Sequence, residues 1–237
     1  MRNSRCLKYR PAALLKKALC FCLLFLSLAG CSHPPAIGSS LPPLRPGELD
    51  AIERELSAHL SDPRYPDEQA ILVTVREGLK GAKERNGGIG ACLVQKSTGE
   101  VIEQAHNRQY VPYFRSDLHA EMDLLDRYEE KMKLTRSSDP NNPTFRNPRN
   151  MKGIVLYTSL EPCPMCITRI INSGVKEVYY AATDEEGGMA QRFDNLPPSW
   201  KRMGDGMVIK PARCSPELRA LAARLFRPMY MAVDHNH

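Results

Sequence analysis

The sequence predicts an α/β domain in which helices cover a central sheet. Two observations lead to this fold class. Apolar runs of strand length alternate with stretches whose apolar residues recur every three or four positions. The composition, 42% hydrophobic and 25% charged over 237 residues, is that of an ordinary globular chain rather than a disordered, collagen-like or polytopic membrane protein. We find no internal repeat. Because strands and helices alternate, the helices are expected to pack on one central sheet.

The first four predicted elements are two helices followed by a hairpin. Leu49, Ile52 and Leu56 recur at helical spacing in the first helix, and two glycines end the second. Two strand-like runs flank the turn Ser97-Thr98-Gly99, which is the pattern of a β-hairpin. The predicted elements are, in chain order, the helices Glu48–Leu60 and Asp67–Asn86 and the strands Ile89–Val94 and Val101–Ala105.

The remaining elements alternate around two loops. Residues 107–117 form a loop that contains Tyr110, Tyr113 and Phe114, and residues 136–152 are polar and interrupted by prolines, which predicts a surface insertion. Apolar runs predict the strands, and amphipathic spacing predicts the helices. In chain order these are a helix at about Leu118–Leu134, strand Gly153–Thr158, helix Pro164–Asn172, strand Val175–Ala181, a weak strand Met207–Lys210 and helix Pro216–Phe226.

The net charge of +6 is confined to the N-terminus. Residues 1–30 hold all six excess basic side chains and no acidic one, so residues 31–237 carry no net formal charge. A strongly basic chain would favour nucleic acid as a partner. Because the body of the chain is neutral, a small-molecule substrate is favoured over nucleic acid.

The N-terminus has the pattern of an export signal. A basic stretch ends at Lys17, and an apolar run of thirteen residues fills 18–30. A spanning helix needs roughly 20 residues, so a signal peptide over 1–30 is favoured over a short membrane anchor. The segment LAGC, which ends at Cys31, resembles the bacterial lipobox. That resemblance implies cleavage before Cys31 and attachment of lipid to its sulfur.

The same resemblance implies a location and a domain organisation. Ser32 stands where an aspartate would retain a lipoprotein at the inner membrane, so we expect lipid anchoring at the outer membrane of the bacterial cell envelope, facing the periplasm. In a host with one membrane, the outer face of the cell would take its place. Residues 32–46 hold five prolines and no acidic residue, which is typical of an extended tether. We therefore expect a tether over 31–46 and a folded domain over 47–237.

Four cysteines fall within the predicted domain: Cys92, Cys163, Cys166 and Cys214. An exported chain with four cysteines could be disulfide-bonded. However, Cys92 lies in the apolar run IGACLV, which is typical of a buried free thiol, and Cys163 and Cys166 form a C-x-x-C motif. The sequence leaves open whether Cys92 pairs with Cys214.

His119, Cys163 and Cys166 form a ligand set suited to a catalytic zinc ion. Cysteines three apart at the start of a helix lie on one face, and Pro164 takes the first helical position, where its missing N–H costs nothing. The helix N-terminus also favours thiolate over thiol. Three protein ligands leave a fourth position for water, whose pKa falls from roughly 15.7 to about 7. Glu121 would then move protons between that water and a substrate.

The motifs His119-Ala120-Glu121 and Pro162-Cys163-Pro164-Met165-Cys166 resemble the zinc-dependent cytidine/deoxycytidylate deaminase superfamily. The stretches GACLV, HNR, LHAEMDLL and LYTSLEPCPMC resemble its purine- and tRNA-type members, and the likeness covers roughly residues 65–190. It implies a three-layer α/β/α fold with a central five-stranded mixed sheet and one Zn²⁺ per chain. It also implies substrate contacts by Asn107, Ala91 and Ala120, and possible homodimers.

The resemblance implies hydrolytic deamination of a free nucleobase or nucleoside. Zinc-bound hydroxide would attack the amino-bearing ring carbon, with Glu121 as the proton shuttle and ammonia as the leaving group. Tyr110, Tyr113 and Phe114 are candidates for stacking on the ring, although packing is the simpler role. The basic residues Arg146, Arg149 and Lys152 in the insertion are a further candidate surface.

Several alternatives remain beside this hypothesis. A structural zinc would need a fourth protein ligand, and a redox C-x-x-C would leave His119 and Glu121 without a role. A tRNA adenosine deaminase would need a phosphate-binding surface. A deaminase-like zinc module could instead act by binding, as an effector without this catalysis. Glu161 is expected to have a structural role in the strand–helix turn.

Overall fold

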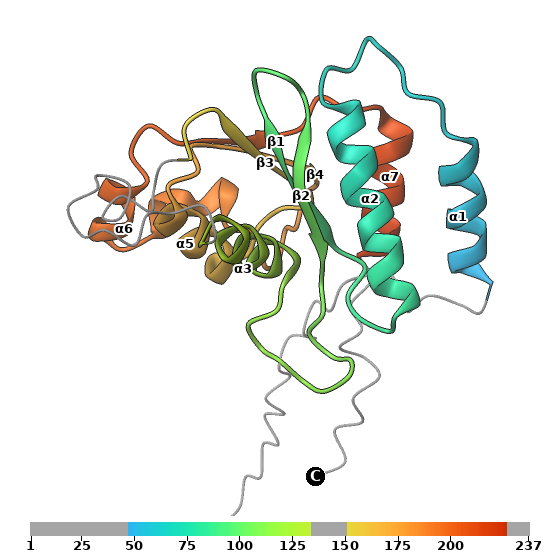
Figure 1. Cartoon of the computed structure of the whole chain (residues 1–237), viewed down its shortest axis with the longest axis horizontal. Coiled ribbons are helices and arrows are strands. Elements are labelled where there is room, and N and C mark those ends of the chain that lie inside the picture. The colour runs from blue at the N-terminus through green and yellow to red at the C-terminus, as the bar shows by residue number, and fades with distance from the viewer. Residues whose placement is uncertain (1–46, 134–150, 227–237) are drawn as a thin grey trace, which may run out of the picture. The chain divides into compact units, whose positions relative to one another are not determined.

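Five strands form one mixed sheet in the order β2-β1-β3-β4-β5 (Figure 1). The computed structural model describes residues 47–133 and 151–226. The strands are β1 (Gly90–Gln95), β2 (Val101–His106), β3 (Ile154–Leu160), β4 (Glu177–Ala182) and β5 (Val208–Pro211). β1 pairs antiparallel with β2 and β3, whereas β3, β4 and β5 run parallel. The central strand β3 is buried along its whole length, because both faces of the sheet are covered.

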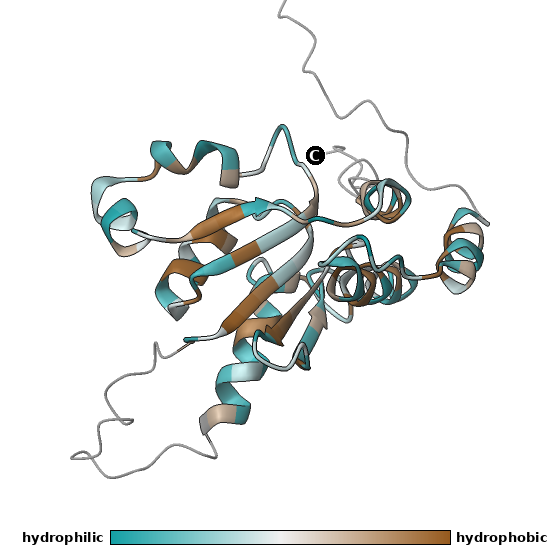
Figure 2. Cartoon of the chain, turned by 90° about the horizontal axis from the view of Figure 1, so that it is seen from above, coloured by the Kyte–Doolittle hydropathy of each residue, from teal (hydrophilic) through white to brown (hydrophobic). Residues whose placement is uncertain are grey.

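Helices cover the two faces of the sheet, and Figures 1 and 2 show the strands between them. Side chains of α2 and α7 pack on one face with Cys92, Val94 and Val155, while side chains of α3 and α5 pack on the other with Leu93 and Leu156. The predicted three-layer α/β/α fold with a five-stranded mixed sheet is therefore confirmed. The helices are α1 (Glu48–Ala58), α2 (Glu68–Lys83), α3 (Ala120–Lys133), α5 (Pro164–Ser173), α6 (Pro198–Met203) and α7 (Pro216–Leu225), with the 3₁₀ helix η1 (Ala190–Asn195).

Each predicted helix and strand is present, and the differences lie at the ends. The second helix, predicted to continue to Asn86, ends at Lys83 because Arg85 has a positive φ of 63° and turns the chain. The two short helices η1 and α6 were not predicted. They carry no apolar periodicity, and prolines border α6, so only tertiary packing reveals them.

Several predictions fall outside the described residues. These are the signal peptide over 1–30, the lipidated Cys31, the tether, and almost all of the insertion with Arg146 and Arg149. Between 47 and 133 and between 151 and 226, no helix is long and apolar enough to cross a membrane.

Candidate active site

The candidate site lies where α3 and α5 begin, on one face of the sheet. The backbone carbonyl of His119 accepts the first α3 hydrogen bond, from the N–H of Asp123 at 2.9 Å. Cys163 is the N-cap of α5 with extended backbone angles, and Pro164 follows at the first helical position as predicted. Because α3 and α5 pack together, the two helix starts bring His119 and the C-x-x-C motif to one place.

His119, Cys163 and Cys166 present their ligand atoms to a common point. The three atoms lie within 4.8 Å of one another, and each cysteine Sγ is 3.6 Å from His119 Nδ1. Cys166 is buried, whereas His119 and Cys163 are partly exposed. Among the described residues, this is the group of histidine, cysteine and carboxylate side chains placed to hold a metal ion.

This donor set fits zinc. Zn–S bonds of about 2.3 Å and Zn–N bonds of about 2.0 Å at tetrahedral angles separate sulfur from nitrogen by about 3.5 Å, close to the separation seen here. Two thiolates and an imidazole are ligands that zinc prefers, and three protein ligands are the number found in catalytic zinc sites. A structural site would need a fourth protein ligand.

The three side chains shift one another's pKa values. The Cys166 thiol donates to Cys163, and with the His119 contact this lowers the pKa of Cys163 to about 4. The same interaction and burial raise the pKa of Cys166. Contact with Cys163 raises the pKa of His119. One cysteine is thus held ready as a thiolate, the form that binds metal.

Glu121 lies directly beside the ligand set and is buried, with 3% of its surface exposed. Its Oε1 accepts a hydrogen bond from Thr158 Oγ1 at 3.1 Å, and its Oε2 lies 3.3 Å from Cys166 Sγ. Burial, with the Cys163 charge, raises the pKa of the Glu121 carboxyl. A buried carboxyl with a raised pKa next to a metal-ligand set is suited to proton transfer.

Sequence reasoning missed Thr158. It lies in the fully buried strand β3, and its hydroxyl holds the Glu121 carboxylate in place while also lying 3.4 Å from the Gly90 carbonyl oxygen. The one available signal is the pair of hydroxyl residues Thr158 and Ser159 in the strand-like run LYTSL, since a buried hydroxyl needs a partner.

Asn107 is buried at the end of β2, and its amide orientation is fixed. Its Oδ1 accepts hydrogen bonds from the N–H groups of Gly87 at 3.2 Å and Gln109 at 3.0 Å. Because both partners donate, the oxygen is committed to the backbone. A ligand that meets this side chain would therefore meet the Nδ2 donor.

The other predicted substrate contacts lie in regular structure. Ala91 is fully buried in β1, paired with Thr158 of β3, and Ala120 is fully buried at the first residue of α3. Ala91 is thus paired with the strand residue that hydrogen-bonds Glu121, and Ala120 directly precedes Glu121 in the sequence. The contacts with substrate stay a prediction.

The aromatic loop is exposed. Tyr113 and Phe114 each keep 64% of their surface accessible, and the Tyr110 and Phe114 rings lie 5.9 Å apart. Tyr113 and Phe114 therefore lie outside the buried core, and Phe114 contacts Tyr110. Their stacking on a substrate stays a prediction.

Glu161 has the structural role expected for it. Its carboxylate accepts from the N–H groups of Asp184 and Gln191 and from the Gln191 side-chain amide. These bonds fix the segment after β4 next to the C-x-x-C motif. The four cysteines of the domain are all free thiols in the structure, including Cys92 and Cys214.

Comparison with known proteins agrees with this geometry. The family model of the cytidine and deoxycytidylate deaminase zinc-binding region matches residues 65–182. The tRNA-specific adenosine deaminase of Bacillus subtilis is 32% identical over 130 residues, which cover 55% of this chain and 70% of that protein. The cytosine deaminase of Candida albicans is 26% identical over 114 residues, which cover 48% and 65%.

A solved structure from a study of A-to-I editing by tRNA deaminases shares the fold. It superposes with a TM-score of 0.50 at 22% identity and covers 66% of this chain and 98% of that one.

Proposed function

Because the chain belongs to the cytidine and deoxycytidylate deaminase zinc-binding family, we propose that it hydrolyses the exocyclic amino group of a free nucleobase or nucleoside. The observation that carries the proposal is the position of Glu121. A buried carboxyl with a raised pKa lies next to two cysteines and a histidine arranged as a three-ligand metal site. Hydrolytic deamination needs both a nucleophilic water and a group that moves its protons.

His119, Cys163 and Cys166 are the residues that would hold zinc, which when bound supplies Lewis acidity that makes water nucleophilic near neutral pH. Glu121 takes a proton from the attacking water, delivers it to the ring nitrogen and assists departure of ammonia. Thr158 keeps the carboxylate oriented during both transfers. Asn107 Nδ2 donates to an acceptor on the ring and so fixes which face meets Glu121.

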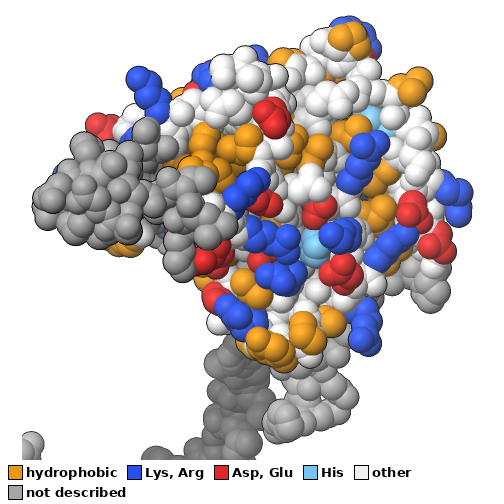
Figure 3. Space-filling view, in the orientation of Figure 1, with side chains coloured by type: hydrophobic (Ala, Val, Ile, Leu, Met, Phe, Trp, Pro, Cys, Tyr) orange, Lys and Arg blue, Asp and Glu red, His pale blue; other side chains and the backbone are white. Residues whose placement is uncertain are grey.

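Charge favours a small substrate over a polynucleotide. On the face seen in Figure 3, basic side chains lie beside acidic ones rather than in a patch of one sign. Arg108 and Arg127 both pair with the buried Asp123, and Arg169 pairs with Asp126 and Glu129. Arginines that are neutralised in this way are poorly available to phosphates.

A second candidate is deamination of adenosine in tRNA. The observation in its favour is the likeness to proteins named tRNA-specific adenosine deaminases, from Bacillus subtilis among others. It would require that the export signal is not used, because tRNA is cytoplasmic.

A substrate panel separates the two candidates. Zinc-loaded protein is incubated with guanine, adenosine, cytosine, cytidine and unmodified tRNA, and ammonia release is measured together with product mass. Turnover of a free base or nucleoside with no inosine formed in tRNA supports the proposal. Inosine in tRNA alone supports the second candidate, and no ammonia from any member contradicts both.

Replacing Asn107 by aspartate should cost activity without unfolding the domain. Aspartate can still accept from Gly87 N–H and Gln109 N–H, but an acceptor oxygen takes the place of the Nδ2 donor. We expect kcat/KM to fall about 100-fold, since a buried acceptor would face an acceptor on the base. Steady-state kinetics and thermal unfolding measure this, and unchanged kcat/KM would exclude Asn107 as a substrate donor.

From the resemblance to the deaminase superfamily we also propose that the protein forms homodimers. We further propose that it is a lipoprotein of the bacterial outer membrane, facing the periplasm, and the support is the signal over 1–30 and the lipobox-like LAGC segment. Replacing Cys31 by serine should move the protein from the detergent-soluble membrane fraction to the soluble fraction. Mass spectrometry of the wild-type N-terminus should find lipid on Cys31, and an unmodified Met1 N-terminus in the cytoplasm would refute the export proposal.

A further inference from the structure

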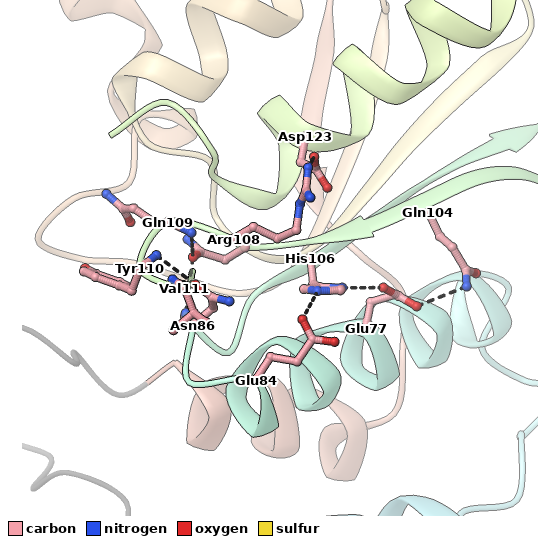
Figure 4. A network of polar contacts seen from close by, with 12 residues as sticks. Glu77, Glu84, Asn86, Gln104, His106, Arg108, Gln109, Tyr110, Val111 and Asp123 are labelled. Atoms are coloured by element: carbon pink, nitrogen blue, oxygen red, sulfur yellow. Dashed lines mark hydrogen bonds and ion pairs between the residues drawn. The ribbon is translucent and has the colours of Figure 1, made fainter. Parts of the chain in front are cut away.

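The second half of α2 is tied to the segment 104–111 by a network of polar contacts (Figure 4). At its centre is His106, the last residue of β2, with 2% of its surface exposed. Its Nδ1 lies 2.8 Å from Glu77 Oε2, and its Nε2 lies 3.1 Å from Glu84 Oε2. Glu77 lies in α2, and Glu84 is the residue that caps the C-terminal end of this helix, seven positions further along the chain.

Both ring nitrogens of His106 face carboxylate oxygens. The ring is therefore held between two carboxylates, one on each side. Such charge-assisted hydrogen bonds are stronger than neutral ones, and they are strongest where water is excluded.

Neighbouring residues hold Glu77 in position and leave space for the His106 ring. Gln104 Nε2 donates to Glu77 Oε1 at 3.1 Å, so the carboxylate is held from a second side. A Cβ at Gly81 would lie 3.2 Å from His106 Cδ2 and 2.9 Å from the Gly87 carbonyl oxygen. Gly81, in the last turn of α2, thus lets the ring and the following turn pack closely on the helix.

Further bonds continue this connection toward the active site. Asn86 Oδ1 accepts from the N–H groups of Tyr110 at 2.8 Å and Val111 at 2.9 Å. In the opposite direction, Asn107 Oδ1 accepts from Gly87 N–H. The charged link through His106 is adjacent in sequence to Asn107, the residue whose amide would face substrate.

We propose that His106 is a positioning residue for substrate binding. Its ring, held between Glu77 and Glu84, fixes the end of β2 and thereby the direction of Asn107 Nδ2. The inference rests on the proposed function, because it assigns Asn107 the substrate contact. A merely structural histidine would affect stability and leave the substrate affinity of the folded protein unchanged.

The chain offers a matched control. His59 Nε2 lies 2.7 Å from Glu68 Oε1, which is a second histidine–glutamate pair on α2. This pair lies at the start of the helix, where Glu68 also contacts Ser215, and it has no link to Asn107. His106→Phe and His59→Phe therefore remove the same kind of contact at two places.

The test compares these variants in the zinc-loaded full chain, using a panel substrate that the wild type deaminates. For His106→Phe we expect KM to rise about tenfold or more with kcat within about threefold, because charge-assisted bonds that place the binding residue are lost. His106→Gln, which restores a donor toward Glu77, should regain part of the affinity. His59→Phe should lower thermal stability and leave KM unchanged.

Two further measurements keep the proposal falsifiable. If His106→Phe fails to fold, Glu84→Ala removes one of the two bonds at a partly exposed residue and should raise KM by a smaller factor. Hydrogen exchange at the amides of 107–109 should speed up in the His106 variants and not in His59→Phe. Equal KM in folded His106→Phe and His59→Phe overturns the inference. A third outcome separates this inference from the proposed function. If exchange at 107–109 speeds up in the His106 variants but the wild type deaminates nothing on the panel, His106 does hold the end of β2 in place, and the proposed function is contradicted.

Discussion

Replacement of Glu121 by glutamine is expected to abolish deamination while the protein stays folded and binds zinc. Glutamine keeps the volume and an oxygen that accepts from Thr158, but it cannot take up and release a proton. A positioned acid–base group contributes about 10²- to 10⁴-fold, and Glu121 serves both proton transfers, so we expect kcat to fall at least about 10³-fold. Single-turnover product analysis and zinc content per chain measure the two effects.

Glu68 provides the control for this variant. It is as buried as Glu121, with 1% of its surface exposed, but it packs with His59 and Ser215 on the opposite face of the sheet. Glu68→Gln should lower stability and leave kcat nearly unchanged. If Glu121→Gln retains wild-type turnover with zinc bound, Glu121 is not the proton shuttle. If the biological phenotype survives Glu121→Gln, the chain acts as a zinc-bearing binding module or effector rather than through catalysis.

The covering of a central sheet by helices and the grouping of His119 with Cys163 and Cys166 could be predicted, because both depend on short-range patterns. A C-x-x-C motif with Pro164 at the first helical position predicts its own local geometry. His119, at the start of the preceding helix α3, joins the two cysteines once α3 and α5 pack together. Likewise, the alternation of strand and helix patterns along the chain predicted a central sheet covered by helices. The predicted elements differ from the structure at their ends, as in α2, where Arg85 turns the chain, and the two short helices η1 and α6 were not predicted.

Contacts between strands and helices distant in sequence could not be predicted. Thr158 reaches Glu121 only because β3 runs next to the start of α3, and the register of a fully buried strand has no alternation to reveal it. The sequence does not reveal the contacts of His106, because its partners Glu77 and Glu84 lie more than twenty residues earlier. The amide orientation of Asn107 likewise follows from Gly87, which only the folded chain brings near.

Loss of one cysteine ligand is the second large effect we expect. In Cys166→Ser, the buried thiol is replaced by a hydroxyl, which is a much poorer zinc ligand than a thiolate. Zinc content should fall from about one ion per chain to a small fraction of that after dialysis, and turnover should fall with it. Thermal stability should drop as well, because a ligand that binds only the folded state stabilises it.

Cys214→Ser is the matched control for the cysteine variant, since Cys214 is also a buried free thiol but is not part of the ligand cluster. It should keep full zinc content and activity. Chelation of the wild type should reproduce the loss seen in Cys166→Ser, and added zinc should restore activity to the wild type alone. Full zinc occupancy in Cys166→Ser would remove Cys166 from the proposed ligand set. We expect that prompt metal binding keeps Cys163 and Cys166 reduced in an exported chain. An oxidised Cys163–Cys166 pair in freshly isolated protein would contradict this, because a disulfide sulfur cannot act as a thiolate ligand.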